Sequence, residues 1–396
     1  MSVDSAGVPQ TNVELFSREL AADPYATYRA LRDLGRAVFV PAHDFWLLSR
    51  YDDVRSAAND WQTWTSSKGA GLLDQFNEPM LGTILATDPP GHDVLRSVLA
   101  EQLAPRSLGR LRGTIEEQVA SIVDLALKSD TVDVVAAMTS QIPVQVVADL
   151  IGLPKEGREV LLPGADAVFN TFGPFTPTVE ERFGQFMAYQ GFMSTFASAD
   201  SLAPGSWGAD VFAAADAGRI GHEDAARLMM AYLVAGMDTT ANGLTSLIEL
   251  FATRPAVWEH VKANPESVGP IFEETLRMES PVQGFFRVAT REVTFDDVTV
   301  PEGGRVLLHF ASANRDDRKY TDPDTFQIDR NPLDHLAFGY GVHTCAGQGL
   351  ARLEARALVS ALLARVDTFE LAGEPVRHEN SVVRGLESLP VTIRTL

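Results

Sequence analysis

Cysteine and basic residues are scarce in this 396-residue sequence. Its single cysteine, Cys345, excludes an internal disulfide and any zinc or iron–sulfur site built from several cysteines. Lysine and arginine number 33 against 53 acidic residues, which gives a formal net charge of −20 at pH 7. Phosphate binding needs clustered basic residues, so this charge argues against nucleic acid as a partner.

Long apolar runs are also absent. The most apolar stretch, residues 228–237, spans ten residues, whereas roughly 20 are needed to cross a bilayer. The first ten residues carry neither the basic nor the apolar region of a signal peptide. We therefore expect no membrane partner and a cytoplasmic location. Hydrophobic residues make up 45% of the chain, enough for a large core, so disordered and fibrous classes are excluded.

The hydrophobic pattern predicts a mainly α protein with a small β region. Alternating β-branched and aromatic residues predict strands within residues 37–49, 293–300 and 306–310. Helical spacing covers residues 23–34, 107–126, 132–151, 179–199, 222–252, 255–278 and 345–366. Repeats, low-complexity tracts and obvious linkers are lacking. We therefore expect one domain over residues 1–396, with a flexible N-terminus at residues 1–15.

The only thiol lies at the start of the last predicted helix, in the glycine-rich run at residues 338–347. A lone cysteine is usually a small buried hydrophobe. Here Gly339, Gly341 and Gly347 allow a tight backbone path and the close approach of a large flat ligand. Free N–H groups at a helix start also stabilise a thiolate. A thiolate held in this way suits iron.

This run resembles the FxxGxHxCxG haem-binding motif of the cytochrome P450 family at every defined position: Phe338, Gly341, His343, Cys345 and Gly347. The resemblance covers nearly the whole chain. It implies a single P450 domain, a triangular helical prism with haem b between a long distal helix and the Cys loop. It also implies Cys345 as the thiolate ligand and a monooxygenase that uses dioxygen and two electrons. Haem contacts would come from Phe338, Gly339, Gly347 and Ala235.

Glu274 and Arg277 have the ExxR spacing, which places both side chains on one helical face. A surface ion pair is the usual outcome of such a spacing. In the family, however, this pair joins an arginine of a later meander, which corresponds here to Arg330. The resemblance therefore implies that these three residues form a buried structural network that supports the haem loop.

An acid and two hydroxyls interrupt the apolar helix near residue 238. One interpretation is structural: Thr239 bonds back to the carbonyl of Ala235, and Asp238 finds a basic partner. The stretch 235–240 also resembles the AGxDTT oxygen-binding groove of the P450 family. That resemblance implies that Ala235 leaves room for dioxygen, Thr239 hydrogen-bonds it, and Asp238 relays protons from solvent.

Haem carries two propionates, and buried carboxylates require cationic or hydrogen-bonding partners. Four residues match the propionate-binding positions of the family: His92, Arg96, Arg287 and His343.

Residues 59–71, 161–174, 273–293 and 384–390 resemble bacterial monooxygenases that O-demethylate para-methoxybenzoate. The resemblance predicts O-demethylation of a para-alkoxybenzoate such as 4-methoxybenzoate to the phenol and formaldehyde. Substrate contacts would come from Lys68, Leu72, Phe169, Phe172, Val282 and Phe285. A carboxylate in an apolar slot must be paired, and Lys68 is the candidate anchor, although most lysines are solvated.

One departure leaves alternatives open. The para-methoxybenzoate enzymes carry an arginine and a serine about two turns before the helix acid, where this chain has Met230 and Ala231. This departure weakens the case for a benzoate carboxylate and leaves room for a neutral aryl ether, a cinnamate or another small hydrophobic compound. A narrow aromatic slot disfavours a macrolide or terpene. A more distant alternative is a non-catalytic haem-thiolate gas sensor, which has no need of the Asp238 and Thr239 relay.

The sequence shows no flavin or iron–sulfur domain. Electrons are expected from a separate ferredoxin and its reductase, or from a fused iron–sulfur flavin reductase, and the chain itself is expected to be a monomer. Arginines flanking the expected cysteine side are candidates for docking an acidic partner, although exposed arginines are usually only solvated. They are Arg106, Arg110, Arg112, Arg352 and Arg356.

Overall fold

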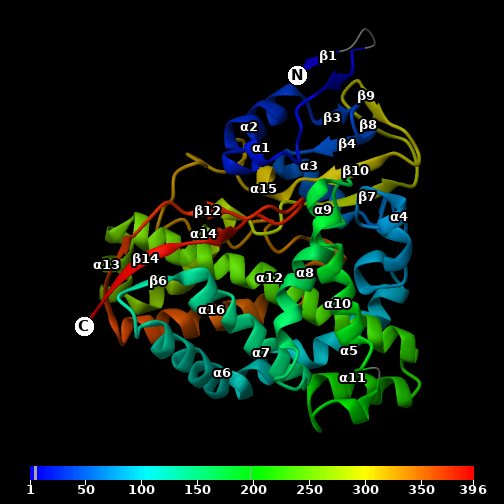
Figure 1. The fold of residues 1–396 in the computed structure, drawn as a ribbon. Coiled ribbons are helices and arrows are strands. Elements are labelled where there is room, and N and C mark those ends of the chain that lie inside the picture. The colour runs from blue at the N-terminus through cyan, green and yellow to red at the C-terminus, as the bar shows by residue number, and fades with distance from the viewer. Residues whose placement is uncertain (4–6, 197) are drawn as a thin grey trace.

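The computed structural model describes residues 1–3, 7–196 and 198–396. A large helical body packs against a smaller β region, which lies at one end of the molecule in Figure 1. The N-terminal segments, in blue, and the strands near residue 300, in yellow, form this β region together. The predicted class, mainly α with a small β region, is confirmed.

The main sheet has seven strands in the order β1-β2-β3-β4-β10-β7-β5. The predicted hairpin of β3 and β4 is antiparallel, and β10 joins β4 in parallel. The bounds are β1 (Ser2–Val3), β2 (Pro9–Gln10), β3 (Ala37–Val40), β4 (Phe45–Leu48), β5 (Trp64–Thr65), β7 (Phe285–Ala289) and β10 (Arg305–Leu308). Part of the predicted flexible N-terminus thus pairs into the sheet, and residues 4–6 of it lie outside the described residues.

Strand β7 runs antiparallel to β10 and carries three consecutive side chains of interest. Successive side chains of a strand point to opposite faces. Phe285 and Arg287 therefore share one face, while Phe286 points to the other and packs with Phe45. This alternation brings an aromatic ring and a guanidinium to the same side of the sheet.

Smaller strand groups complete the β structure. They are β11 (Val366–Leu371), β14 (Pro390–Thr395) and β6 (Thr131–Asp133) in one sheet, and the hairpins β8 (Val293–Phe295) with β9 (Val298–Val300) and β12 (Val376–Arg377) with β13 (Leu386–Ser388).

Helix α12 (His222–Thr253) has 32 residues and runs through the helical body. Most of its side chains are buried, as expected for a helix that is apolar on nearly every face. It packs against α7 (Gln141–Ile151), α8 (Leu161–Asn170), α11 (Trp207–Asp216) and α14 (Val268–Glu279). The polar residues at its centre are therefore held inside the protein.

The remaining helices frame this centre. They are α1 (Arg18–Ala22), α2 (Tyr25–Leu34), α3 (Tyr51–Asn59), α4 (Asp74–Asn77), α5 (Gly91–Leu103), α6 (Pro105–Ala126), α9 (Pro177–Glu181), α10 (Phe183–Met193), α13 (Pro255–Ala263), α15 (Phe310–Ala313) and α16 (Gln348–Leu363).

Three predicted helices differ from the observed ones. The helix predicted at 255–278 is divided into α13 and α14, because Pro265 disfavours helical backbone at Asn264. The one predicted at 132–151 opens with β6, which pairs with β14, and a π-helical turn before α7. The one predicted at 179–199 is divided between α9 and α10. Proline overrides local periodicity at the first of these places, and strand pairing does so at the second.

The last helix begins at Gln348 rather than at Cys345. The backbone N–H of Cys345 donates to the carbonyl of Phe338 at 2.8 Å, which keeps the cysteine in the loop before the helix. Across residues 1–3, 7–196 and 198–396, every helix is too short or too polar to span a bilayer.

Candidate active site

The Cys loop is fixed by two glycines and by backbone N–H groups. Gly339 and Gly341 have φ values of 67° and 73°, in the left-handed region that favours glycine. A Cβ on Gly341 would also collide with the carbonyl oxygen of Ala58. Beyond this turn, the N–H groups of Gly347 and Gln348 hydrogen-bond the sulfur of Cys345. The thiol thus faces two donors at the entrance of α16.

Burial raises the pKa of the Cys345 thiol, while the two N–H groups and Arg96 oppose that shift. A metal ion overrides such a rise, since a coordinating thiol is deprotonated outright. The residues that the structure describes contain no cluster of three or more histidine, cysteine or acidic side chains that could hold a metal. Any iron here would depend on a single protein thiolate.

Four cationic or imidazole groups gather beside this loop. The rings of His92 on α5 and His343 lie with centroids 4.6 Å apart. Arg96 follows one turn after His92 and interacts electrostatically with Cys345. Burial, together with the charges of Arg287 and His92, lowers the pKa of His343 to about 2. The structure therefore brings together all four residues predicted to hold propionates.

Arg287 lacks an ion-pair partner among the described residues, and His92, whose Nδ1 lies 3.3 Å from Asp93, has one ring nitrogen without a partner. Arg287 is 5% exposed and forms no ion pair among the described residues; it donates from Nη1 to the carbonyl of Phe286 at 2.7 Å. Burial lowers its pKa to about 10. His92 Nε2 is buried without a hydrogen-bond partner in the same part of the chain. Buried cations and donors require anionic partners, so this cradle fits the two carboxylates of a haem.

The facing wall of the site is formed by α12. Ala235 is exposed, although Leu233 and Met237 on the same helix are buried. Its small side chain therefore borders open space inside the helical body. Gly236 packs closely on α7, where an added Cβ would lie 3.3 Å from Val147. The predicted small face of α12 is thus in place.

Asp238 is buried on α12, and only one of its oxygens is satisfied. Oδ1 accepts a hydrogen bond from Nδ2 of Asn242 at 3.0 Å, whereas Oδ2 has no partner among the described residues. Burial, assisted by the negative charge of Asp166, raises the pKa of Asp238 to about 7. The carboxyl group can therefore gain or lose a proton near neutral pH.

Thr239 forms the back-bond that the structural interpretation predicted. Its hydroxyl donates to the carbonyl of Ala235 at 2.7 Å. This bond uses the hydroxyl proton but leaves the oxygen lone pairs as acceptors. Thr239 can therefore still accept a hydrogen bond from a protonated group in the open space beside Ala235.

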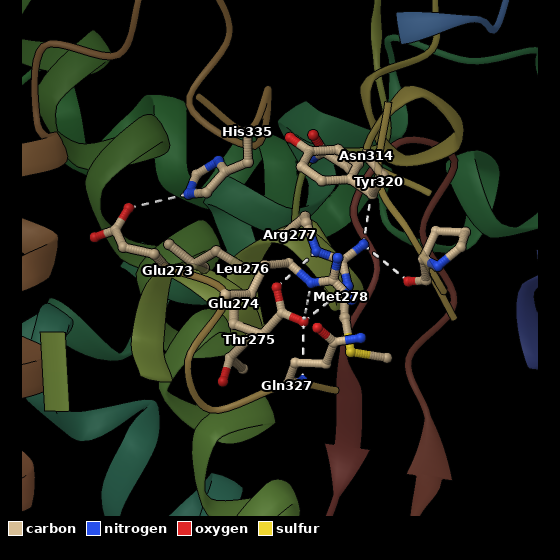
Figure 2. Close-up of polar contacts among 12 residues, drawn as sticks. Glu273, Glu274, Thr275, Leu276, Arg277, Met278, Asn314, Tyr320, Gln327 and His335 are labelled. Carbon is tan, nitrogen blue, oxygen red and sulfur yellow. Dashed lines mark hydrogen bonds and ion pairs between the residues drawn. The ribbon is translucent and has the colours of Figure 1, made fainter. Parts of the chain in front are cut away.

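Glu274 and Arg277 form a buried ion pair, shown in Figure 2, and Arg330 joins them in one network. Arg277 donates from Nε and Nη2 to Glu274 at 2.7 and 2.9 Å, and Arg330 Nε donates to Glu274 at 2.9 Å. Nη1 of Arg277 donates to the carbonyl of Asn314 at 2.7 Å. Asn314 in turn accepts the backbone N–H of Leu336, just before the Cys loop.

A second network missed by the sequence analysis lies beside the first. Glu273 pairs with His335 at 3.0 Å (Figure 2) and with Arg352 of α16 at 2.6 Å. Glu273 and Glu274 therefore bind the chain on both sides of Cys345. Arg352, predicted as a docking residue, is already paired here, and its side chain is 26% exposed.

Three predicted substrate residues form an aromatic cluster next to α12. The rings of Phe169 and Phe172 lie 6.0 Å apart, and those of Phe172 and Phe285 lie 5.4 Å apart. Val234 of α12 packs against this cluster. Val282 is held nearby by a β-bridge to Val383, whose side chain belongs to the cluster.

Leu72 and Lys68, which were also predicted to contact the substrate, do not join this aromatic cluster. The backbone N–H of Leu72 donates to the carbonyl of Phe172 at 2.8 Å, but its side chain packs in another cluster with Leu47 and Phe286. Lys68 is exposed and forms no hydrogen bond or ion pair with the described residues. The structure thus leaves the proposed carboxylate anchor at the surface.

Sequence reasoning also missed Asp88, which accepts hydrogen bonds from three consecutive hydroxyl residues, Thr65, Ser66 and Ser67. Ser66 Oγ lies 2.9 Å from Nε2 of His343, so this acid supports the Cys loop from the other side. The run of three hydroxyl residues was the only sequence signal for it.

Comparisons with known proteins agree with this geometry. The family model described as Cytochrome P450 matches residues 208–384. Cytochrome p450 CYP199A2 of Rhodopseudomonas palustris is 38% identical over 99% of this chain and 96% of its own. The beta-dihydromenaquinone-9 omega-hydroxylase of Mycobacterium tuberculosis is 30% identical over 97% of this chain and 78% of its own.

Among solved structures, P450BioI in complex with an acyl carrier protein ligated to hexadec-9Z-enoic acid superposes with a TM-score of 0.86. The two sequences are 27% identical, and the match covers 95% of this chain and 100% of that one.

Proposed function

The chain belongs to the cytochrome P450 family, and within this family of haem-thiolate monooxygenases we propose that it O-demethylates a para-alkoxybenzoate such as 4-methoxybenzoate. The observation that carries the proposal is the cluster of Phe169, Phe172 and Phe285 beside α12. Aromatic rings prefer edge-to-face or offset contacts with other rings, so this cluster suits a flat aromatic substrate.

Cys345 would supply the thiolate ligand of the haem, and His92, Arg96, Arg287 and His343 would bind its propionates. When bound, it supplies the oxygen chemistry: dioxygen, two electrons and two protons deliver one oxygen atom to the substrate and the other to water. Every further contribution comes from side chains of this chain.

The proposed reaction balances at the methoxy carbon. One C–H bond is converted to C–OH, which gives a hemiacetal of formaldehyde. The bond between the methyl carbon and the ether oxygen then breaks, and the hydroxyl proton moves to that oxygen. The products are 4-hydroxybenzoate and formaldehyde, and the two electrons come from a redox partner.

Protons are proposed to reach the site through Asp238. Its Oδ2 is free to take a proton, and its pKa of about 7 allows exchange near neutrality. Thr239 accepts a hydrogen bond at its Oγ1 and so orients the proton delivered by Asp238. Ala235 provides the room that both groups need.

Electrons are proposed to come from a ferredoxin-type partner, since P450s of the bacterial type use separate redox partners. Helix α16 follows the Cys loop in the sequence and packs against α6. These two helices carry four exposed arginines: Arg106, Arg110, Arg112 and Arg356. Charge reversal of Arg112 and Arg356 should slow reduction and weaken its salt dependence. Unchanged values for both would count against this docking face.

The alternative is a neutral aryl ether or a cinnamate. Met230 lies one turn before Val234, which contacts the aromatic cluster, so the face of α12 that looks toward the slot is apolar. An apolar wall does not compensate a carboxylate, so this observation favours the neutral aryl ether and not the cinnamate. Because the chain belongs to a family of monooxygenases, the gas-sensor alternative has no support.

The test is a titration of the ferric enzyme with 4-methoxybenzoate and with the uncharged 4-methoxytoluene, following the low-spin to high-spin change in haem absorption. We expect a tight response to the acid alone. Because Lys68 lies at the surface and an exposed charge pair contributes at most about 1 kcal/mol, Lys68→Met should weaken this response by no more than about fivefold. Lys155→Met, at an exposed lysine far along the chain, is the control. A response to the ether alone would favour the alternative, and no response to either would overturn the aromatic slot.

The expected monomer and cytoplasmic location stay predictions. Light scattering of the haem-loaded enzyme and fractionation of the producing cell would check them.

A further inference from the structure

A polar cluster centred on Asp166 lies between three distant segments. Asp166 on α8 accepts hydrogen bonds from Arg182, between α9 and α10, and at Oδ1 from His378 Nε2 at 2.6 Å. Asn380 donates from Nδ2 to the same oxygen at 2.7 Å. This cluster borders the aromatic cluster, because Asn380 Oδ1 accepts the backbone N–H groups of Val382 and Val383, which pack with Phe169 and Phe172.

The cluster lies within electrostatic reach of Asp238. Asp166 raises the pKa of Asp238, while His378 and Arg182 lower it. These three are the charged groups that face Asp238 from α8, from the segment between α9 and α10, and from the loop after β12. On its own helix, Asn242 occupies Oδ1. Oδ2 is the oxygen left for exchange with the cluster.

A cavity of about 50 Å³ adjoins the cluster on its outer side, large enough for water. Its wall includes His378 and Asn380 from the C-terminal loop and Ser17 from the start of α1. Ser17 is half-buried and its neighbour Arg18 is exposed, so the cavity borders solvent. The side chain of His378 is 16% exposed and that of Asp166 is 10% exposed. His378 therefore stands between the cavity and the buried acids.

We propose that His378 supplies protons from this cavity to Asp238. Water in the cavity protonates the imidazole, Asp166 and Arg182 hold the ring in place, and the imidazolium passes one proton to Oδ2 of Asp238 through a bridging water. Each proton given up is replaced from the cavity, and no electron moves. The inference rests on the proton role proposed for Asp238. His378 acts through Asp238 and is therefore a positioning residue.

The electrostatics suit this transfer. Burial lowers the pKa of His378, but the hydrogen bond and charge of Asp166, together with the charge of Asp238, raise it above the ordinary histidine value. The pKa of Asp238 is raised to about 7. The raised pKa of Asp238 makes this carboxylate a better proton acceptor for the imidazolium than an ordinary aspartate would be.

The competing explanation is structural, since the same bonds tie the C-terminal loop to α8. His378→Gln separates the two. Glutamine can still donate to Asp166 but cannot carry a proton between cavity and acid. The control is His222→Gln, at an exposed histidine that begins α12 and pairs only with Asp216.

The first measurement needs no substrate: an NMR pH titration of the histidine ring protons in the haem-loaded, carbon monoxide-bound ferrous enzyme. His378, assigned by its absence from His378→Gln, should titrate above the ordinary histidine value. Asp238→Asn should lower that value, because it removes a nearby negative charge. A His378 titration that does not respond to Asp238→Asn would overturn the proposal.

The second measurement is turnover in H₂O and D₂O. In His378→Gln, product formation should slow by up to about tenfold, and the solvent isotope effect on turnover should increase. The unfolding temperature of this variant should stay near that of His222→Gln. An isotope effect equal to the control would overturn the proposal. If the wild-type enzyme fails to oxidise 4-methoxybenzoate, the substrate assignment fails, and the NMR titration still decides the role of His378.

Discussion

The side-chain amide of Asn242 holds Asp238 from one turn further along α12. Its Nδ2 donates to Oδ1 of Asp238 at 3.0 Å and to the backbone carbonyl of the same residue at 2.9 Å. The carboxyl group is thereby fixed with one oxygen engaged and the other available. Any change that displaces Asn242 should therefore affect proton delivery as well as packing.

Gly385→Ala should produce such a displacement. A Cβ on Gly385 would collide with the side chain of Asn242. We expect a loss of about 1–3 kcal/mol in unfolding free energy and a smaller fraction of consumed oxygen that appears as product. Thermal unfolding and the ratio of product to oxygen measure the two effects.

The control is Gly113→Ala on α6, where an added Cβ meets nothing within 4 Å. Alanine is the better helix former, so this variant should gain up to about 1 kcal/mol. Equal stability and coupling in the two variants would contradict the proposed contact.

Thr239→Val should uncouple oxygen consumption from product formation several-fold with little change in stability. The variant removes the hydroxyl oxygen that accepts a hydrogen bond near Ala235 but keeps the branched shape. Oxygen uptake, peroxide release and product are measured together. Thr253→Val removes an equivalent back-bonded hydroxyl of the same helix, where Oγ1 donates to Glu249 at 2.7 Å. If Thr239→Val and Thr253→Val convert the same fraction of the consumed oxygen to product, the Thr239 hydroxyl has no role beyond its hydrogen bond to the carbonyl of Ala235.

Glu354→Gln should stabilise the protein at pH 8 and have little effect at pH 5. Both carboxyl oxygens of Glu354 on α16 are buried without a partner among the described residues, and burial raises the pKa to about 8. The folded state therefore binds this proton more tightly than the unfolded state, whose value is near 4.5. The contribution of this group to the unfolding free energy is complete below about pH 4.5 and is lost as the pH rises through 8.

Glutamine resembles the neutral form of the acid and does not ionise, so the variant should not lose this unfolding free energy as the pH rises. The expected gain at pH 8 is on the order of a few kcal/mol, measured by denaturant unfolding of the haem-loaded enzyme across pH 5–8. Glu116→Gln, at an exposed position of α6, should show no such pH dependence. Parallel curves for the wild type and Glu354→Gln would contradict the raised pKa.

Glu274→Gln should lower both stability and haem content. The substitution leaves the guanidinium groups of Arg277 and Arg330 buried without their shared carboxylate. Removing one partner of a buried ion pair typically costs about 3–5 kcal/mol. Haem per chain and thermal unfolding are the measurements. Glu223→Gln breaks a pair on α12 whose acid is 79% exposed and should cost less than about 1 kcal/mol. Similar losses in both would show that the network contributes little.

Features that depend on residues only a few positions apart could be predicted from the sequence. The Cys loop, the acid and threonine of α12, and the glutamate and arginine of α14 all depend on spacings of a few residues, and local spacing determines which side chains share a helical face. The division of the helix at Pro265 was missed because helical spacing was followed across it, although a local signal was present, since proline restricts the residue before it.

Long-range contacts could not be predicted in this way. Asp166 and His378 are 212 positions apart, and each alone looks like an ordinary surface residue. Leu72 was misplaced for a different reason: its neighbours follow a family pattern, but the direction of its side chain depends on a backbone hydrogen bond to Phe172. Such orientations follow from tertiary packing and leave no periodic signal.

Strand β7 carries a consequence for how this enzyme can change. Phe285 of the aromatic cluster and Arg287 of the cationic cradle lie on one face, and Phe286 locks the other face into the core. Inserting or deleting one residue would turn all three side chains over at once. The side chain at position 285 can therefore vary without moving Arg287 or Phe286, whereas a change in the length of the strand would move all three.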